Sequence, residues 1–95
     1  MTAAAAQTML SALGLHQPAT VLAVDAPAHT PEWADWLAQI GFLPGEVVTL
    51  MARARPGGDP LVVRIGDSTF ALRLAEAACV QVAPRSAAAG ERSAR

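Results

Sequence analysis

Short apolar runs, separated by Pro and Gly, occupy the middle of the chain and are typical of strands. In residues 46–55, Val48 and Leu50 alternate with side chains of the opposite face, which is the period-2 pattern of a half-buried strand. Arg53 and Arg55 fall together on that second, outer face. The chain is therefore expected to be mainly β, with five strands at residues 20–25, 46–55, 61–65, 69–73 and 79–82.

The connections between the later strands are too short for parallel pairing. Residues 56–60 read Pro-Gly-Gly-Asp-Pro and predict a hairpin loop of about five residues, and residues 66–67 read Gly-Asp and predict a two-residue hairpin. Residues 74–78 have room for a single helical turn. A parallel crossover needs a dozen or more residues, so the strands are expected to form a small, strongly bent antiparallel barrel.

One segment between the first two strands has helical periodicity. Its large apolar residues recur at i, i+3, i+4 and i+7, which places them on one side of a helix. Thr30 suits the N-cap, Pro31 the first helical position and Gly41 the end. This side is expected to be covered by the sheet; alternatively, one Trp stays partly exposed as an anchor for a partner. It comprises Trp33, Trp36, Leu37 and Ile40.

The two ends of the chain lack apolar periodicity. Residues 1–8 are alanine-rich and residues 84–95 consist mostly of Ala, Ser, Gly and Arg, so we expect a flexible N-terminal tail and a disordered C-terminal tail. Folding is expected within residues 9–83, as one domain. Leu10 and Leu13, three residues apart, are predicted to form a short helical turn at its start.

Charge and cysteine content narrow the functional classes. The formal net charge is −1, which gives no bulk attraction to nucleic acid. All Arg residues lie after residue 50, so any basic surface is local. A single cysteine, Cys79, excludes an internal disulfide and is expected to be a small packed apolar residue. No apolar run is long enough to span a membrane and no secretory signal is evident, which predicts a cytoplasmic protein.

Catalytic and metal-binding patterns are weak. Ser68, His29 and Asp25 would supply a nucleophilic trio, but no Gly-x-Ser-x-Gly turn accompanies them, so no catalytic residue and no cofactor are expected. His16, His29 and nearby acidic residues carry metal-ligand atoms without a diagnostic spacing, so no metal residue is assigned. A metal-binding carrier remains an alternative function.

Three ordered pieces of the chain form a recognisable set. They are residues 37–45, which read Leu-x-x-Ile-Gly-x-x-Pro-Gly; residues 58–60 with 62–63; and residues 71–73 followed by 75–77 and Val80. Through these pieces residues 33–82 resemble the FeoA family, the small accessory proteins of bacterial ferrous iron uptake, and the resemblance extends more weakly upstream through residues 10–13 and 19–25. The sequence departs from the usual family pattern at Trp33 and Trp36, where other members often carry polar or basic residues.

The resemblance implies an SH3-like barrel with one inserted helix and no enzymatic activity. It also implies that the protein acts in the cytoplasm with the membrane transporter FeoB, and that it is held at the inner membrane only through that partner. A homo-oligomer is compatible with it. A regulatory SH3-like domain related to metal-dependent transcriptional repressors is a second alternative. Contact with the cytosolic part of FeoB is expected from Trp33, Trp36, Leu43, Arg53, Arg55 and Arg73.

Overall fold

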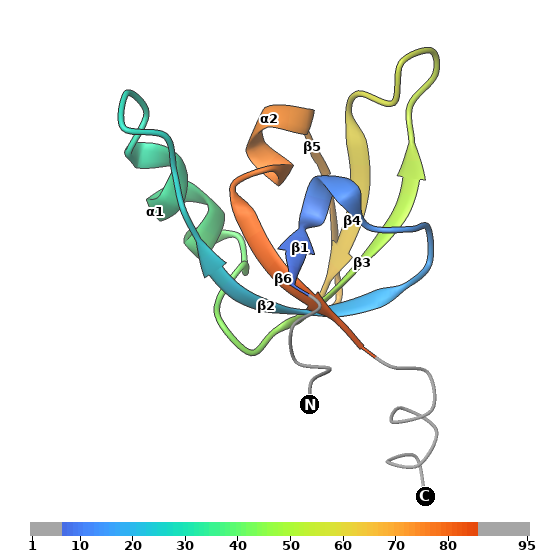
Figure 1. Ribbon diagram of the computed structural model, residues 1–95, viewed down its shortest axis with the longest axis horizontal. Coiled ribbons are helices and arrows are strands. Elements are labelled where there is room, and N and C mark those ends of the chain that lie inside the picture. Colours follow the sequence, from blue (N-terminus) through green and yellow to red (C-terminus); the bar gives the residue numbers. More distant parts are fainter. Residues whose placement is uncertain (1–6, 86–95) are drawn as a thin grey trace, which may run out of the picture.

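A computed structural model describes residues 7–85 as one antiparallel sheet of six strands, in the order β1-β6-β2-β3-β4-β5, with three short helices (Figure 1). The elements in chain order are β1 (Thr8–Met9), the 3-10 helix η2 (Leu10–Ala12), β2 (Pro18–Val24), α1 (Glu32–Gln39), β3 (Val47–Arg53), β4 (Leu61–Ile65), β5 (Ser68–Leu72), α2 (Leu74–Ala77) and β6 (Val80–Pro84).

The sheet bends around one apolar core. Strands β2, β3, β4 and β6 each turn alternate side chains inward, as in β4, where Leu61, Val63 and Ile65 are buried between exposed or half-buried neighbours. Leu10 of η2 and Ala77 of α2 are fully buried and close the core from the side. No helix within residues 7–85 is long and apolar enough to cross a membrane.

The predicted strands are all present, with one strand more than the sequence indicated. The extra strand is β1, which pairs with β6 through Thr8 opposite Val82 and Met9 opposite Gln81. The single turn at α2 and the helical turn at η2, where Leu10 is fully buried, are confirmed. The predicted tails, residues 1–8 and 84–95, lie mostly outside the described residues. Of the tail residues that the structure describes, Thr8 belongs to β1 and Pro84 ends β6.

A bulge in β3 reverses the predicted facing of its second half. Leu50 pairs with Val63, but the next pairs are Ala52 with Val62 and Arg53 with Leu61, so Met51 is an extra residue. Cross-strand partners share a face, and Leu61 is fully buried. The prediction that Arg53 shares the outer face with Arg55 is therefore wrong, because one inserted residue inverts the alternation.

Helix α1 begins differently from the prediction. Pro31 takes the N-cap place, and no side chain caps the helix. Thr30 contributes only its carbonyl oxygen, which accepts a hydrogen bond from the Trp33 N–H at 3.0 Å, while its buried hydroxyl has no hydrogen-bond partner among residues 7–85. The predicted side-chain cap at Thr30 is therefore absent. Gly41 follows the helix end with φ 120°, a backbone conformation that glycine adopts freely.

The turn after α1 is fixed to strand β2 by two hydrogen bonds. The Gly45 N–H donates to the Val21 carbonyl and the Val21 N–H donates to the Glu46 carbonyl, each at 2.8 Å. Leu37, on the inner side of α1, is fully buried, and Phe42, just after the helix, is also buried. The helix and its turn are thus anchored along one side of β2, away from the β3–β4 hairpin (Figure 1).

Candidate partner-binding surface

Large apolar side chains remain in solvent around α1 and the turn that follows it. Trp36 of α1 is 38% exposed and Leu43 in the turn is 47% exposed. Val47 at the start of β3 and Leu22 of β2 are exposed to a similar degree. Leu22 directly follows Val21, whose backbone holds the turn, so all four belong to the same end of the fold. We call these four residues the α1 surface.

The two tryptophans of α1 have different environments. Trp33 is half-buried and packs against the core with Ile40, whereas Trp36 is 38% exposed. Leu37 is the fully buried residue of the helix. Neither tryptophan is fully buried, and Trp36 is the more exposed of the two, so it is the better candidate for the anchor of the second alternative.

The α1 surface has an acidic surround. Glu32 and Asp35 lie in the first turn of α1, and Glu46 lies in the turn after it, all three exposed. Residues 1–50 contain no Arg or Lys. A partner that covers these apolar side chains is therefore expected to bind better if it carries Lys or Arg at the edge of its own contact surface.

The three arginines predicted to contact a partner have separate roles in the fold. The Arg53 guanidinium Nη2 donates hydrogen bonds to the carbonyls of Ser11 at 2.9 Å and Leu13 at 3.0 Å. Arg55 is exposed in the β3–β4 loop. Arg73 is exposed between β5 and α2, and its backbone N–H donates to Glu76 Oε1 at 2.9 Å. Arg53 therefore holds η2 to the end of β3, whereas Arg55 and Arg73 are open to solvent.

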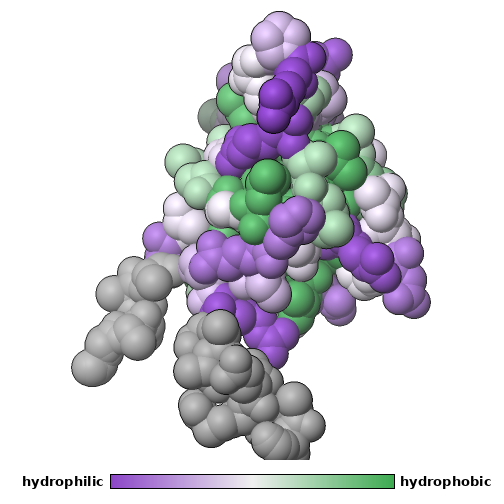
Figure 2. Space-filling model, turned by 90° about the vertical axis from the view of Figure 1, so that its right-hand side faces the viewer, coloured by the Kyte–Doolittle hydropathy of each residue, from purple (hydrophilic) through white to green (hydrophobic). Residues whose placement is uncertain are grey.

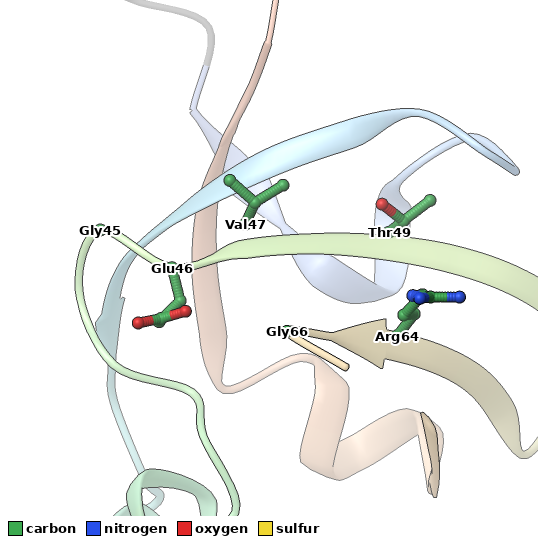
Figure 3. A pocket seen from close by; sticks show the side chains of 6 residues that line it. All are labelled: Gly45, Glu46, Val47, Thr49, Arg64 and Gly66. Atoms are coloured by element: carbon green, nitrogen blue, oxygen red, sulfur yellow. The ribbon is translucent and has the colours of Figure 1, made fainter. Parts of the chain in front are cut away.

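Two shallow hollows lie on the sheet. One, of about 330 Å³, lies where β3 begins and the β4–β5 turn approaches it; Figure 3 shows the Glu46 carboxylate directed away from the Arg64 guanidinium across it. The other, of about 300 Å³, lies beside the end of β5 and is lined by Asp59, Pro60, Ala71 and Arg73. The first is lined by Gly45, Glu46, Val47, Thr49, Arg64 and Gly66.

The face that carries the β3–β4 hairpin has a mixed surface. Figure 2 shows hydrophilic atoms at the hairpin tip and along the lower margin, with hydrophobic atoms gathered between them. Hydrophilic and hydrophobic side chains are therefore interspersed on this side of the molecule.

The metal-ligand side chains and the thiol are dispersed. Within residues 7–85, no group of three or more His, Cys, Asp or Glu fits a metal ion. His16 is exposed, with φ 64°, in the loop before β2, and His29 is exposed before α1. Cys79 is buried and its Sγ donates to the Ala75 carbonyl at 3.4 Å. Burial, followed by the nearby charges of Glu76 and Asp25, raises the pKa of the Cys79 thiol. The thiol is held as a neutral packed group.

Comparison with known protein families shows to which family the chain belongs. The model of the FeoA domain matches residues 8–84, which include every described strand and helix. The chain belongs to the FeoA family. The predicted resemblance is thereby confirmed, and it extends upstream of residues 33–82 to β1, η2 and β2. The family is linked to ferrous iron transport.

Solved FeoA structures share the fold and a substantial part of the sequence. FeoA of Stenotrophomonas maltophilia, an SH3 domain protein solved with zinc, is 40% identical, with a TM-score of 0.72 over 79% of this chain and 88% of that one. Iron(II) transport protein A of Clostridium thermocellum is 32% identical, with a TM-score of 0.69 over 81% of this chain and 45% of that one. The expectation of a small, mainly β, SH3-like domain is confirmed.

A more distant likeness concerns the fold alone. A manganese-dependent transcriptional repressor superposes with a TM-score of 0.71 at 20% identity, over 83% of this chain and 42% of the repressor. No curated protein matches the FeoA chain described here.

Proposed function

We propose that this FeoA protein is a non-enzymatic accessory protein of bacterial ferrous iron uptake that binds the cytosolic part of the FeoB transporter. The family match over residues 8–84 supports the link with iron uptake. In this proposal the protein works in the cytoplasm, reaches the inner membrane only through its partner, and alters the assembly or the nucleotide cycle of the transporter.

The exposed apolar residues of the α1 surface carry the binding proposal. Trp36 of α1 is 38% exposed and Leu43 is 47% exposed. Leu43 lies in the turn after α1, which two backbone hydrogen bonds hold to β2. A preorganised apolar surface loses little conformational entropy on binding, and tryptophan is enriched at positions that dominate binding energy. The acidic surround favours a partner segment that combines apolar side chains with Lys or Arg.

The predicted contact residues take unequal parts in this proposal. Trp36 and Leu43 contact the transporter directly, and Trp33, which packs against the core, helps to hold α1 in place. Arg53 acts through the fold, because its guanidinium is engaged by the carbonyls of Ser11 and Leu13. Arg55 and Arg73, both exposed, are secondary contacts for acidic groups at the opposite side of the molecule.

Calorimetric titration of the full chain with the cytosolic region of FeoB tests the proposal. Leu43→Ala and Trp36→Ala are each expected to weaken binding by about tenfold or more, as residues central to an interface do. Leu15→Ala is the matched control, since Leu15 is 51% exposed but lies before β2. Absence of binding by the unmodified chain, or equal losses for Leu43 and Leu15, would contradict the proposal.

A further inference from the structure

Strand β5 forms one edge of the sheet built by residues 7–85. Among these residues it pairs only with β4, and the sheet order ends at β5. Ile65 pairs with Ser68 across the two-residue turn, so this pair and every second pair after it exchange hydrogen bonds. The residues between them, Thr69 and Ala71, therefore direct their backbone N–H and C=O groups away from β4, and both residues are exposed.

Strand β5 itself lacks three features that usually prevent strand addition: a charged residue, a Pro and a bulge. Native edge strands are commonly protected by charged residues, Pro or a bulge. Strand β5 reads Ser-Thr-Phe-Ala-Leu, has no charge and no Pro, and pairs with β4 without a register shift. The other end of the sheet, β1, is only two residues long. The β5 edge is thus the part of the described sheet best suited to receive another strand.

The charges that flank β5 are complementary to those of a second β5. Asp67 and Arg73 lie three residues before and three residues after Phe70, and both are exposed. A two-fold axis at Phe70 places Thr69 opposite the second copy's Ala71, which allows four backbone hydrogen bonds. The same axis brings Arg73, just after β5, toward the turn that holds the second copy's Asp67, twice in the assembly, so opposite charges approach each other at both ends.

We propose that two copies of this chain associate through antiparallel pairing of their β5 edges, with Thr69 opposite Ala71 and with Arg73 of each copy near the turn that holds Asp67 of the other. The backbone pairing ends at Ala71, because the Arg73 N–H is already engaged by Glu76. An edge this short buries less surface than a stable dimer needs, so the dimer should have a dissociation constant on the order of 0.1–1 mM in water. The α1 surface stays free in this assembly.

Sedimentation equilibrium of the full chain, up to about 1 mM, tests the proposal in the range expected for a small interface. Arg73→Asp sets like charges against each other at both ends and should weaken the dimer by about tenfold. The exchange of both residues, Asp67→Arg with Arg73→Asp, should restore it. Arg64→Asp makes the same charge change on the exposed side of β4 and is the matched control.

Ala71→Pro provides a second variant, since an edge strand tolerates Pro where its N–H faces solvent. It removes one outward donor and should also abolish the dimer, while circular dichroism verifies folding. Amide hydrogen exchange at Thr69 and Ala71 should slow as the protein concentration rises. The proposal is overturned if the chain is monomeric at about 1 mM, or if the dissociation constant of the dimer is the same in the Arg73→Asp and the exchanged variants. It is also overturned if the β5 edge pairs only with a strand of another protein.

Discussion

At the β3–β4 end of the molecule a half-buried charged side chain is bonded to the fold, whereas at the α1 surface large apolar side chains stay partly exposed. Arg53 donates to two carbonyls of the η2 segment, and Trp36 and Leu43 are 38% and 47% exposed. Arg53, which its charge alone would assign to partner binding, instead forms hydrogen bonds within the fold. The position of a residue relative to bulges and turns therefore decides its role more than its chemical type does.

The largest expected effect concerns the attachment of α1. Leu37→Ala removes the fully buried side chain of the helix and should lower the free energy of unfolding by about 2–5 kcal/mol, measured by urea denaturation. Trp36→Ala, one position earlier and 38% exposed, should lower it by less, about 1–2 kcal/mol. Similar losses for the two variants would remove the distinction between the inner and outer sides of α1.

A smaller effect is expected at the other end of the comparison. Arg53→Met keeps most of the side-chain stem but leaves the Ser11 and Leu13 carbonyls without their donor, which should lower the free energy of unfolding by about 1–3 kcal/mol. Arg55→Met, in the exposed loop, should change it by less than about 0.5 kcal/mol. Thermal unfolding of both variants measures the difference, and an unchanged Arg53 variant would show that the guanidinium is dispensable for the fold.

The turn that presents Leu43 depends on a glycine. Gly45 has φ 93°, and a Cβ there would meet no atom within 4 Å, so Gly45→Ala tests backbone conformation alone. It should lower the free energy of unfolding by about 1 kcal/mol. Gly14→Ala, where φ is not positive and the nearest atom is 3.6 Å away, should have a smaller effect. An unchanged unfolding curve for the Gly45 variant would show that the turn adapts freely.

The smallest effect is a pH dependence at Cys79, next to the turn that leads into β6. Burial raises the pKa of the folded thiol above its ordinary value of 9.0, so the folded state holds the proton more tightly than the unfolded chain. The resulting stabilisation is complete below pH 9.0 and is lost as the pH rises through the folded pKa. Melting temperatures from neutral pH upward should fall more steeply for the parent chain than for Cys79→Ala, and parallel profiles would argue against this effect.

The sequence was sufficient to place most of the elements. Alternation identified β4, and Gly66 with Asp67 identified the two-residue turn, because period and turn residues are local properties. Strand β1 gave no such signal, since two residues cannot display a period and its pairing with Val82 is set by the fold. The bulge at Met51 was equally hidden, because an inserted residue becomes visible only when the partner strand is aligned.

The candidate surface was only partly predictable. The spacing of Trp33, Trp36 and Leu37 indicated one apolar side of a helix, but periodicity cannot say how far the sheet extends beneath it. Leu37 is completely buried, Trp33 is half-buried against the core, and Trp36 is 38% exposed. Exposure at Leu22 and Val47 had no sequence signal, because both residues read as ordinary strand positions.

The most direct test of partner binding follows the backbone amide resonances of the isotope-labelled chain while the cytosolic region of FeoB is added. The account predicts that the largest shifts or line broadening occur at Trp36, Leu43 and Val47, with Arg53 and the end of β3 nearly unaffected. Changes concentrated on the β3–β4 hairpin, with the α1 surface unperturbed, would contradict it.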